Sequence, residues 1–151
     1  MTAETTNTRA SQGLPEWASV ATSSHAHWFL RLPLAAIILD QGANKMPYLV
    51  DDAASYGFPL WLWTLTAVGE ILAGLALIIG GLFAYAWAKN LPVFKSFPWF
   101  GDVVTRLGGL GISIIVAAVI YVVYWGPWTG FQLHLMMLGG GLFFLWRGNK
   151  A

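Results

Sequence analysis

The sequence predicts an all-α, polytopic membrane protein: an antiparallel bundle of four transmembrane helices with both chain termini in the cytoplasm. Three observations predict this fold class. Of the 151 residues, 57% are hydrophobic and only 10% are charged, whereas soluble domains carry about 25% charged residues. Nine tryptophans suit the aromatic belts that membrane proteins place at the lipid–water interface. The apolar residues gather in four segments joined by short connections.

The same composition excludes several classes of protein and site. The chain has no cysteine, which excludes disulfides, thiolate metal sites, iron–sulfur ligation by this chain and thiol redox chemistry. The net charge is only +1, so no general basic surface is offered to nucleic acid, and we expect no nucleic-acid partner. Disordered chains are poor in apolar residues, so a wholly disordered chain is excluded as well.

Residues 1–26 are polar and are expected to form an N-terminal cytoplasmic tail. No apolar stretch with a small-residue cleavage site follows a basic start, as a secretory signal would require. The piece from Leu14 to Trp17 could begin a short helix with Trp17 at the membrane surface. A flexible tail is the simpler alternative, because chain termini are usually poorly ordered.

Residues 27–148 are expected to form the transmembrane domain, with spans over about 28–46, 60–87, 103–125 and 131–146. A spanning helix needs about 20 apolar residues. The second and third segments meet this length and carry one charge each, Glu70 and Arg106. The first segment is amphipathic at its far end and the last is short, so both are expected to rely on neighbouring helices. The connections between the spans are compact, as expected for antiparallel neighbours.

The basic residues predict the orientation of the bundle. With four spans, both termini and the connection between the second and third spans share one side of the membrane. That side collects seven of the eight Lys and Arg residues: Arg9, Arg31, Lys89, Lys95, Arg106, Arg147 and Lys150. The other side has Lys45 alone, beside Asp51 and Asp52. The positive-inside rule therefore places both termini in the cytoplasm.

Small residues predict where the helices touch, because helices in lipid associate through close packing rather than through apolar burial. Residues four apart lie on one face of a helix. Such faces are formed by Ala76, Gly80, Ala84 and Ala88 in the second span and by Gly109, Ser113 and Ala117 in the third. The run 139–141 is all glycine and leaves the last span smooth. None of these glycines precedes a Walker-type lysine between a strand and a helix, so we expect them to be structural.

A candidate site is formed by polar residues that fall inside the predicted spans: Arg31, Asp40, Gln41, Lys45, Glu70, Arg106 and His134. At a rise of about 1.5 Å per residue, Asp40 and Glu70 lie at similar depth near the middle of the membrane. A charge near the bilayer centre costs at least about 2.5 kcal/mol. We therefore expect one of the two carboxyl groups to be protonated, or both to face a polar cavity.

Two interpretations of Asp40 and Glu70 stay open. They could line a pocket that holds a quinone headgroup or passes protons, or each could pair with an Arg, Gln or Asn of a neighbouring helix and hold the bundle together. Hydrogen bonds at this depth are expected from nearby polar side chains: Gln41, Asn44, Thr64, Thr66 and Ser113.

The basic candidates also have two interpretations each. Arg31 and Arg106 lie near the cytoplasmic edge and are expected to extend to lipid phosphates; an inward contact with Glu70 or Asp40 is the alternative. His134 is either a hydrogen-bonded helix residue or a ligand or proton carrier. A haem would need His134 as its axial ligand, because no other histidine lies inside a predicted span. We expect no metal site.

Four motifs resemble those of the DoxX-like family of small four-helix membrane proteins. An arginine, Arg31, opens the first span, and a G-x-x-K motif, Gly42 to Lys45, ends it. A Glu-x-x-x-Gly-Leu run begins at Glu70 in the second span, and Arg106 opens the third. The resemblance covers about residues 28–147. It implies a bacterial inner-membrane protein linked to respiratory or sulfur redox chemistry; the related DoxD protein is a subunit of a thiosulfate:quinone oxidoreductase.

Three hypotheses of function follow. In the first, the chain is a membrane subunit of a larger bacterial redox or energy-converting complex, where it docks other membrane subunits and lines a quinone-accessible pocket in the lipid bilayer. In the second, it is an oxidoreductase subunit that binds quinone itself, with Asp40, Glu70 and His134 handling protons. In the third, it is a small-solute or ion transporter built as an oligomer. Quinone is the one cofactor that these hypotheses suggest, and no residue is identified as catalytic.

Overall fold

The computed structural model describes residues 26–83, 97–123 and 128–149. Within these ranges the chain is all-helical, as predicted, and has no strand. The elements are α2 (Trp28–Lys45), the short 3-10 helix η1 (Met46–Tyr48), α3 (Leu49–Ser55), α4 (Leu60–Leu82), α7 (Phe100–Val122) and α8 (Trp128–Arg147). The expectations for the tail, for Ala84 and Ala88, and for most of the connection 90–102 lie outside the described residues.

Two of these helices, α4 and α7, are long and apolar enough to cross a membrane. Among the described helices, α2 and α8 do not meet the same criterion; α2 carries Arg31, Asp40 and Lys45 within its 18 residues. Large apolar side chains of α4 and α7 point outward, and Leu65, Leu72 and Ile114 are each exposed over more than half of their surface. An outer surface of this kind suits contact with hydrocarbon rather than with water.

The segment between α2 and α4 is more structured than the plain connection that the sequence suggested. Helix α3 has Asp51 and Asp52 in its first turn, where the helix dipole favours carboxylates. It ends before Gly57, whose φ of 69° is the left-handed conformation that glycine adopts without strain. Pro59 then holds an extended backbone as the N-cap of α4, so α4 begins at Leu60.

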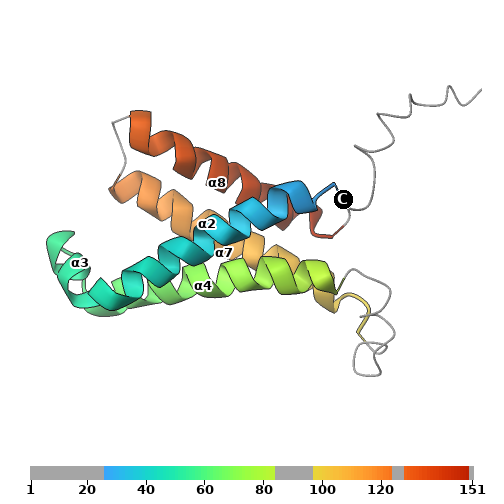
Figure 1. Cartoon of the computed structure of the whole chain (residues 1–151), viewed down its shortest axis with the longest axis horizontal. Coiled ribbons are helices and arrows are strands. Elements are labelled where there is room, and N and C mark those ends of the chain that lie inside the picture. Colours follow the sequence, from blue (N-terminus) through green and yellow to red (C-terminus); the bar gives the residue numbers. More distant parts are fainter. Residues whose placement is uncertain (1–25, 84–96, 124–127, 150–151) are drawn as a thin grey trace, which may run out of the picture.

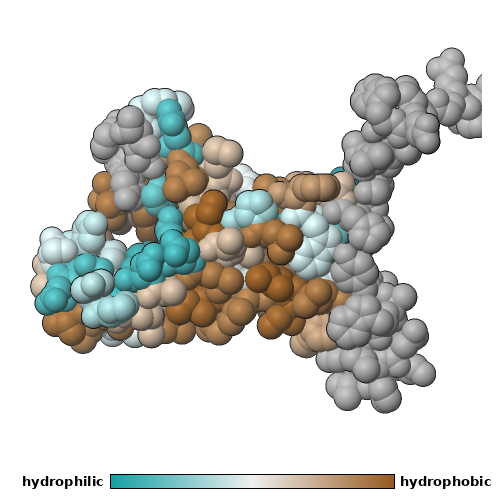
Figure 2. Space-filling view, viewed as in Figure 1, coloured by the Kyte–Doolittle hydropathy of each residue, from teal (hydrophilic) through white to brown (hydrophobic). Residues whose placement is uncertain are grey.

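The long helices pack in chain order: α2 against α4, α4 against α7, and α7 against α8. Helices α2 and α8 make far fewer contacts with each other. Figure 1 shows that they approach at the end where α2 begins and separate toward the end that carries α3. Hydrophilic side chains gather over α3 and the adjoining end of α2 (Figure 2). The bundle therefore has a closed end and an open end.

Glycines lie where the helices cross. A Cβ added at Gly109 of α7 would lie 2.7 Å from the carbonyl oxygen of Gly141 in α8. One added at Gly80 of α4 would lie 2.9 Å from the carbonyl oxygen of Gly101 in α7. The predicted small-residue contacts are therefore confirmed at Gly80, Gly109 and Gly141. Gly139 is different, since a Cβ there would meet no heavy atom of the described chain within 4 Å.

Candidate functional site

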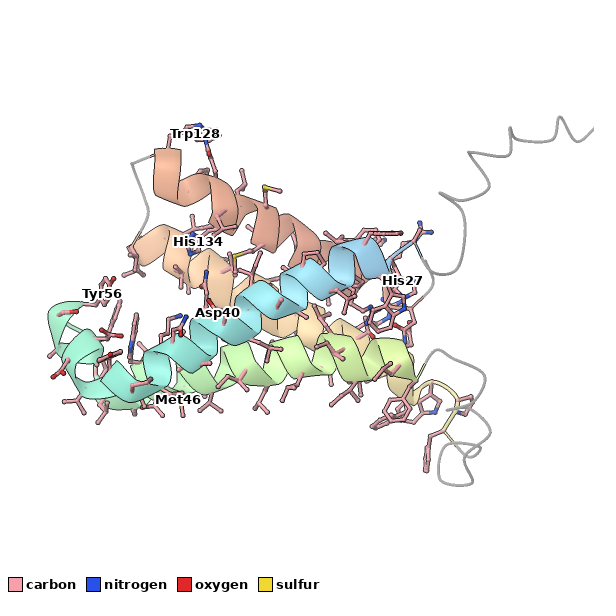
Figure 3. All side chains as sticks on the ribbon, viewed as in Figure 1. His27, Asp40, Met46, Tyr56, Trp128 and His134 are labelled. Carbon is pink, nitrogen blue, oxygen red and sulfur yellow. The ribbon has the colours of Figure 1, made fainter. Side chains whose placement is uncertain are left out.

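A polar pocket of about 330 Å³ lies at the open end of the bundle. Its volume is within the range of small-molecule sites, about 300–1,000 Å³. Five helices or their ends contribute its walls: Asp40, Gln41, Asn44 and Lys45 from α2, Asp52 from α3, Tyr56 after it, Trp63 from α4, Val119 and Val123 at the end of α7, and His134 from α8. Asp40, Tyr56 and His134 are seen around this opening in Figure 3.

Four of the seven predicted site residues line this pocket: Asp40, Gln41, Lys45 and His134. The spacing of the α2 residues explains part of the arrangement. Asp40 and Asn44 are four residues apart, as are Gln41 and Lys45, so these pairs lie on adjoining strips of one helix face. A fifth predicted residue, Glu70 of α4, is joined to the pocket through Lys45.

Lys45 and Glu70 form an ion pair between α2 and α4, with the Lys45 ammonium donating a hydrogen bond to Oε1 of Glu70. The Glu70 side chain is 2% exposed and the Lys45 side chain 17% exposed. One turn earlier, a Cβ on Gly42 would lie 2.7 Å from the Ala67 carbonyl oxygen. The G-x-x-K motif thus has a physical basis: the glycine lets α2 approach α4, and the lysine reaches the buried carboxylate.

Two buried polar atoms have no hydrogen-bond partner among the described residues, one in the lining residue Trp63 and one in Glu70, the ion-pair partner of the lining residue Lys45. They are Oε2 of Glu70, an acceptor, and Nε1 of Trp63, a donor. Leaving a buried polar atom unpaired costs about 1–3 kcal/mol. The described structure therefore leaves one acceptor and one donor near Lys45 and Tyr56 without a partner.

Of the charged groups around the pocket, some form ion pairs with other described residues and others do not. Lys45 and Glu70 neutralise each other, and His134 is buried within electrostatic range of the Glu70 carboxyl. Asp40 is exposed to the opening, and its carboxylate makes no ion pair or hydrogen bond with the described part of the chain. Glu70 therefore links two helices, as the structural interpretation requires, while Asp40 remains available to a ligand.

The polar groups of Thr64, Thr66 and Ser113 do not serve the pocket, so the expectation that they supply hydrogen bonds there is wrong. Each hydroxyl donates to the backbone carbonyl four residues earlier, at Leu60, Leu62 and Gly109. This local bond competes with any longer-range one, because the hydroxyl of a helical Ser or Thr reaches its own preceding turn first.

Arg31 lies at the closed end, where its side chain is fully buried. The expectation that it extends to lipid phosphates is therefore wrong. Its guanidinium donates to the Leu77 carbonyl oxygen, to Oγ1 of Thr105 at 3.0 Å and to Oδ1 of Asn149 at 2.8 Å. It also stacks over the ring of Phe144, 4.6 Å from its centroid. These contacts join all four long helices at one residue.

Asn149 completes this closed end. Its amide Nδ2 donates to the Gly80 carbonyl oxygen at 2.8 Å, and its backbone N–H donates to Oδ1 of Asp102 at 2.8 Å. Asp102 also accepts a hydrogen bond from Nε of Arg106 at 2.7 Å. The chain after α8 is thus tied to α4 and α7.

Arg106 acts at the C-terminal end of α8. Its Nη1 donates to the carbonyl oxygens of Leu145 at 2.9 Å and Trp146 at 2.7 Å, which lack partners within the helix. Arg31 and Arg106 are therefore structural residues at the closed end, and the structure does not bring them into the pocket.

Sequence reasoning missed several residues that matter at both ends. At the open end these are Asp52, Tyr56 and Trp63 of the pocket wall. At the closed end they are Thr105, Asp102 and Asn149. For Asn149 the sequence offers an indirect signal, because Gly148 directly precedes it and a glycine just after a helix marks a C-cap. The φ of Gly148, 60°, is the left-handed conformation expected there. Among the described residues, no group of three or more His, Asp or Glu could hold a metal ion.

Comparison with known proteins finds a family that matches part of the chain. The DoxX family model matches residues 26–88; no curated protein and no solved structure matches the chain. The matched stretch is shorter than the motifs suggested, since it contains α2, α3 and α4 but not Arg106 or α8. It does contain Gly42, Lys45 and Glu70. Two described helices, α4 and α7, are long and apolar enough to cross a membrane, and residues 26–88 match the DoxX model, so the chain is a helical membrane protein that contains a DoxX-like region.

Proposed function

We propose that this protein is a membrane subunit of a bacterial redox or energy-converting complex and that its polar pocket receives the headgroup of a quinone. The observation that carries the proposal is the unpaired Oε2 of buried Glu70, whose other oxygen accepts from Lys45 in the wall of the pocket of about 330 Å³. A reduced quinone ring can donate a hydroxyl hydrogen to this oxygen, and its other oxygen can accept from Nε1 of Trp63. Electrons would come from a redox-active partner subunit.

The pocket's remaining groups support a ring rather than a metal or a large solute. Tyr56 and Trp63 present aromatic surface, with their ring centroids 5.1 Å apart, and such surface packs well against a flat ring. The amide groups of Gln41 and Asn44 lie in the same wall and can both donate and accept hydrogen bonds. Seven of the ten lining residues have polar side chains, and Val119 and Val123 are the aliphatic ones, so the pocket suits the polar headgroup of a ligand and not its hydrocarbon part.

Binding can be measured in lipid nanodiscs that hold the purified chain, with a dimethoxy-methyl-benzoquinone and its reduced form as probes. Glu70→Gln should weaken binding of the reduced probe by about tenfold or more, since a hydrogen bond to a charged group contributes about 1.5–3 kcal/mol. Thr64→Val is the matched control, because the Thr64 hydroxyl is bonded to its own helix. Equal affinity in the wild type and Glu70→Gln would overturn the proposal.

A proton-handling role within this subunit is a second candidate. It is supported by His134 and Asp40, which line the pocket, and by the nearness of His134 to Glu70. Reduction of a quinone consumes two electrons and two protons, and these groups could deliver the protons. Asp40→Asn and His134→Gln should then slow quinone turnover in the native complex without weakening binding of the headgroup probe. Unchanged turnover would leave the subunit with a binding and scaffolding role alone.

We also propose that all four long helices span the bacterial inner membrane with both termini in the cytoplasm. The helices contain 18 to 23 residues, which at about 1.5 Å per residue matches a hydrocarbon core of about 30 Å. Arg31, Arg106 and Arg147 lie at one end and Lys45 at the other. Because the chain has no cysteine, Ser11→Cys and Ser55→Cys provide clean labels. An impermeant thiol reagent should label only Ser55→Cys in spheroplasts; the reverse result would contradict this topology.

A further inference from the structure

A second cavity, an apolar groove of about 360 Å³, lies between α4 and α7. Its walls include Phe58, Leu62, Leu65, Ile114 and Ala118. The one hydroxyl side chain in its lining, Thr66, is already bonded to the Leu62 carbonyl oxygen at 3.0 Å. The described walls of the groove therefore offer hydrocarbon surface to an occupant.

This groove adjoins the polar pocket directly. Three residues line both cavities: Trp63, Val119 and Val123. The Trp63 ring is stacked on Tyr56, a pocket residue, with centroids 5.1 Å apart, and on Phe58, a groove residue, with centroids 5.9 Å apart. Trp63 thus lies at the boundary between the polar pocket and the apolar groove.

We propose that one amphiphilic molecule occupies both cavities, with its polar ring in the pocket and its hydrocarbon chain in the α4/α7 groove, past Trp63. This rests on the proposed function and names the class of ligand: a quinone that carries a long hydrocarbon chain. The groove shares Trp63, Val119 and Val123 with the headgroup site and is of similar volume, so the occupant that it fits is the chain of the same ligand rather than a separate lipid.

The energetic reason for such a groove is packing. Lipid tails are as apolar as the groove, so transfer from the bilayer brings little hydrophobic gain. A chain that fits between two helices gains van der Waals contacts. Because it is tethered to a bound headgroup, it also enters the groove at high effective concentration. The expected advantage over a chainless headgroup is therefore several-fold.

The test compares two probes with the same dimethoxy-methyl-benzoquinone ring, one with a decyl chain and one without, at equal mole fraction in the nanodisc bilayer. The wild type should bind the decyl probe at least threefold more tightly. Ala118→Phe fills the groove and should remove this preference while it leaves the affinity for the chainless probe unchanged. Ala117→Phe is the matched control: Ala117 is also exposed on α7 and lines neither cavity.

The outcomes separate the two proposals. If the chainless probe binds but the decyl chain adds nothing, the groove belongs to bilayer lipid and this inference falls while the headgroup site stands. Retention of the preference in Ala118→Phe also overturns it. If neither probe binds the wild type, both proposals fall. Should Ala118→Phe not fold, Val122→Trp fills the same groove from its exposed rim and is judged by the same criteria.

Discussion

At the end of the bundle where α2 begins, α2 and α8 lie together, and the buried guanidinium of Arg31 is bonded to Leu77, Thr105 and Asn149. At the other end α2 and α8 are apart (Figure 1), and buried Glu70 is paired through Oε1 only. Both ends bury charge in an apolar protein. At the closed end the Arg31 guanidinium donates to three oxygen atoms of the protein, whereas at the open end Oε2 of Glu70 has no hydrogen-bond partner among the described residues and Lys45, the partner of Oε1, lines a polar pocket.

The number of hydrogen bonds that a buried polar group makes within the protein distinguishes structural from functional residues better than the residue type does. A buried polar group destabilises the fold unless it is hydrogen-bonded. Each such group is therefore either bonded within the protein, where it holds the helices together, or able to bond a ligand. Arg31 and Asn149 belong to the framework. Glu70 links α2 to α4 and still offers an acceptor. Variants at the closed end should therefore change stability, and variants at the open end should change binding.

The largest expected effect on stability comes from Arg31→Leu. Hydrogen bonds to charged groups contribute about 1.5–3 kcal/mol each, and loss of three is partly offset by no longer burying a cation. We expect a net loss of about 3 kcal/mol. Thermal unfolding in detergent micelles measures it. Arg31→Lys should recover only part, since one ammonium cannot replace a planar fork that reaches separate helices.

Glu70→Gln provides the comparison in the same assay and should lower the free energy of unfolding by about 1 kcal/mol or less, because glutamine can still accept from Lys45. If Arg31→Leu unfolds at the wild-type temperature, or Glu70→Gln is the less stable of the two, the assignment of the two ends is wrong.

A second prediction concerns the glycine crossing of α7 and α8. A Cβ at Gly109 would lie 2.5 Å from the backbone nitrogen of Leu145, an atom that cannot move without moving α8. Gly109→Ala should therefore destabilise the bundle by about 1–3 kcal/mol. Gly139→Ala is the matched control, with nothing of the described chain within 4 Å; it should be neutral or stabilising by up to about 1 kcal/mol. Melting temperatures that shift in the same direction would contradict the helix packing described above.

The smallest expected effect is that of Arg106→Gln. The Arg106 side chain is 34% exposed, so its pair with Asp102 is screened by solvent and contributes little. The variant also loses the hydrogen bonds from Arg106 to the last carbonyl oxygens of α8. We expect the free energy of unfolding to fall by about 1 kcal/mol in total. The difference in melting temperature from the wild type should shrink at high salt. A loss as large as that of Arg31→Leu would show that the closed end depends on Arg106 instead.

Much of the helical framework could be predicted because apolar segments and small residues carry their own signals. Gly109 and Gly141 were expected at helix contacts and are found there. Helix α3 escaped prediction, since its seven residues are too few to show a period. The separation of α2 and α8 at the open end could not be predicted either, because periodicity tells which face of a helix is apolar but not which neighbouring helix covers that face.

The candidate site could be predicted in part for a similar reason. Polar residues inside apolar segments stand out, which identified Asp40, Lys45, Glu70 and His134. The position of Arg31 along its helix did not show that its side chain is buried at the closed end. Its partners there, Thr105 and Asn149, are far away in the sequence and belong to no recognisable motif. Trp63 could not be singled out among nine tryptophans, because a number this large also suits the aromatic belts of a membrane protein.

The most direct test of the central claim is to locate the headgroup by photo-cross-linking the nanodisc-embedded chain with an azido-substituted benzoquinone and mapping the adducts by mass spectrometry. Label should concentrate on the pocket walls, at Asp40–Lys45, Tyr56–Trp63 or His134, and excess unlabelled benzoquinone should remove it. Label confined to the closed end around Arg31, or spread over the outward faces of α4 and α7 without competition, would contradict the account.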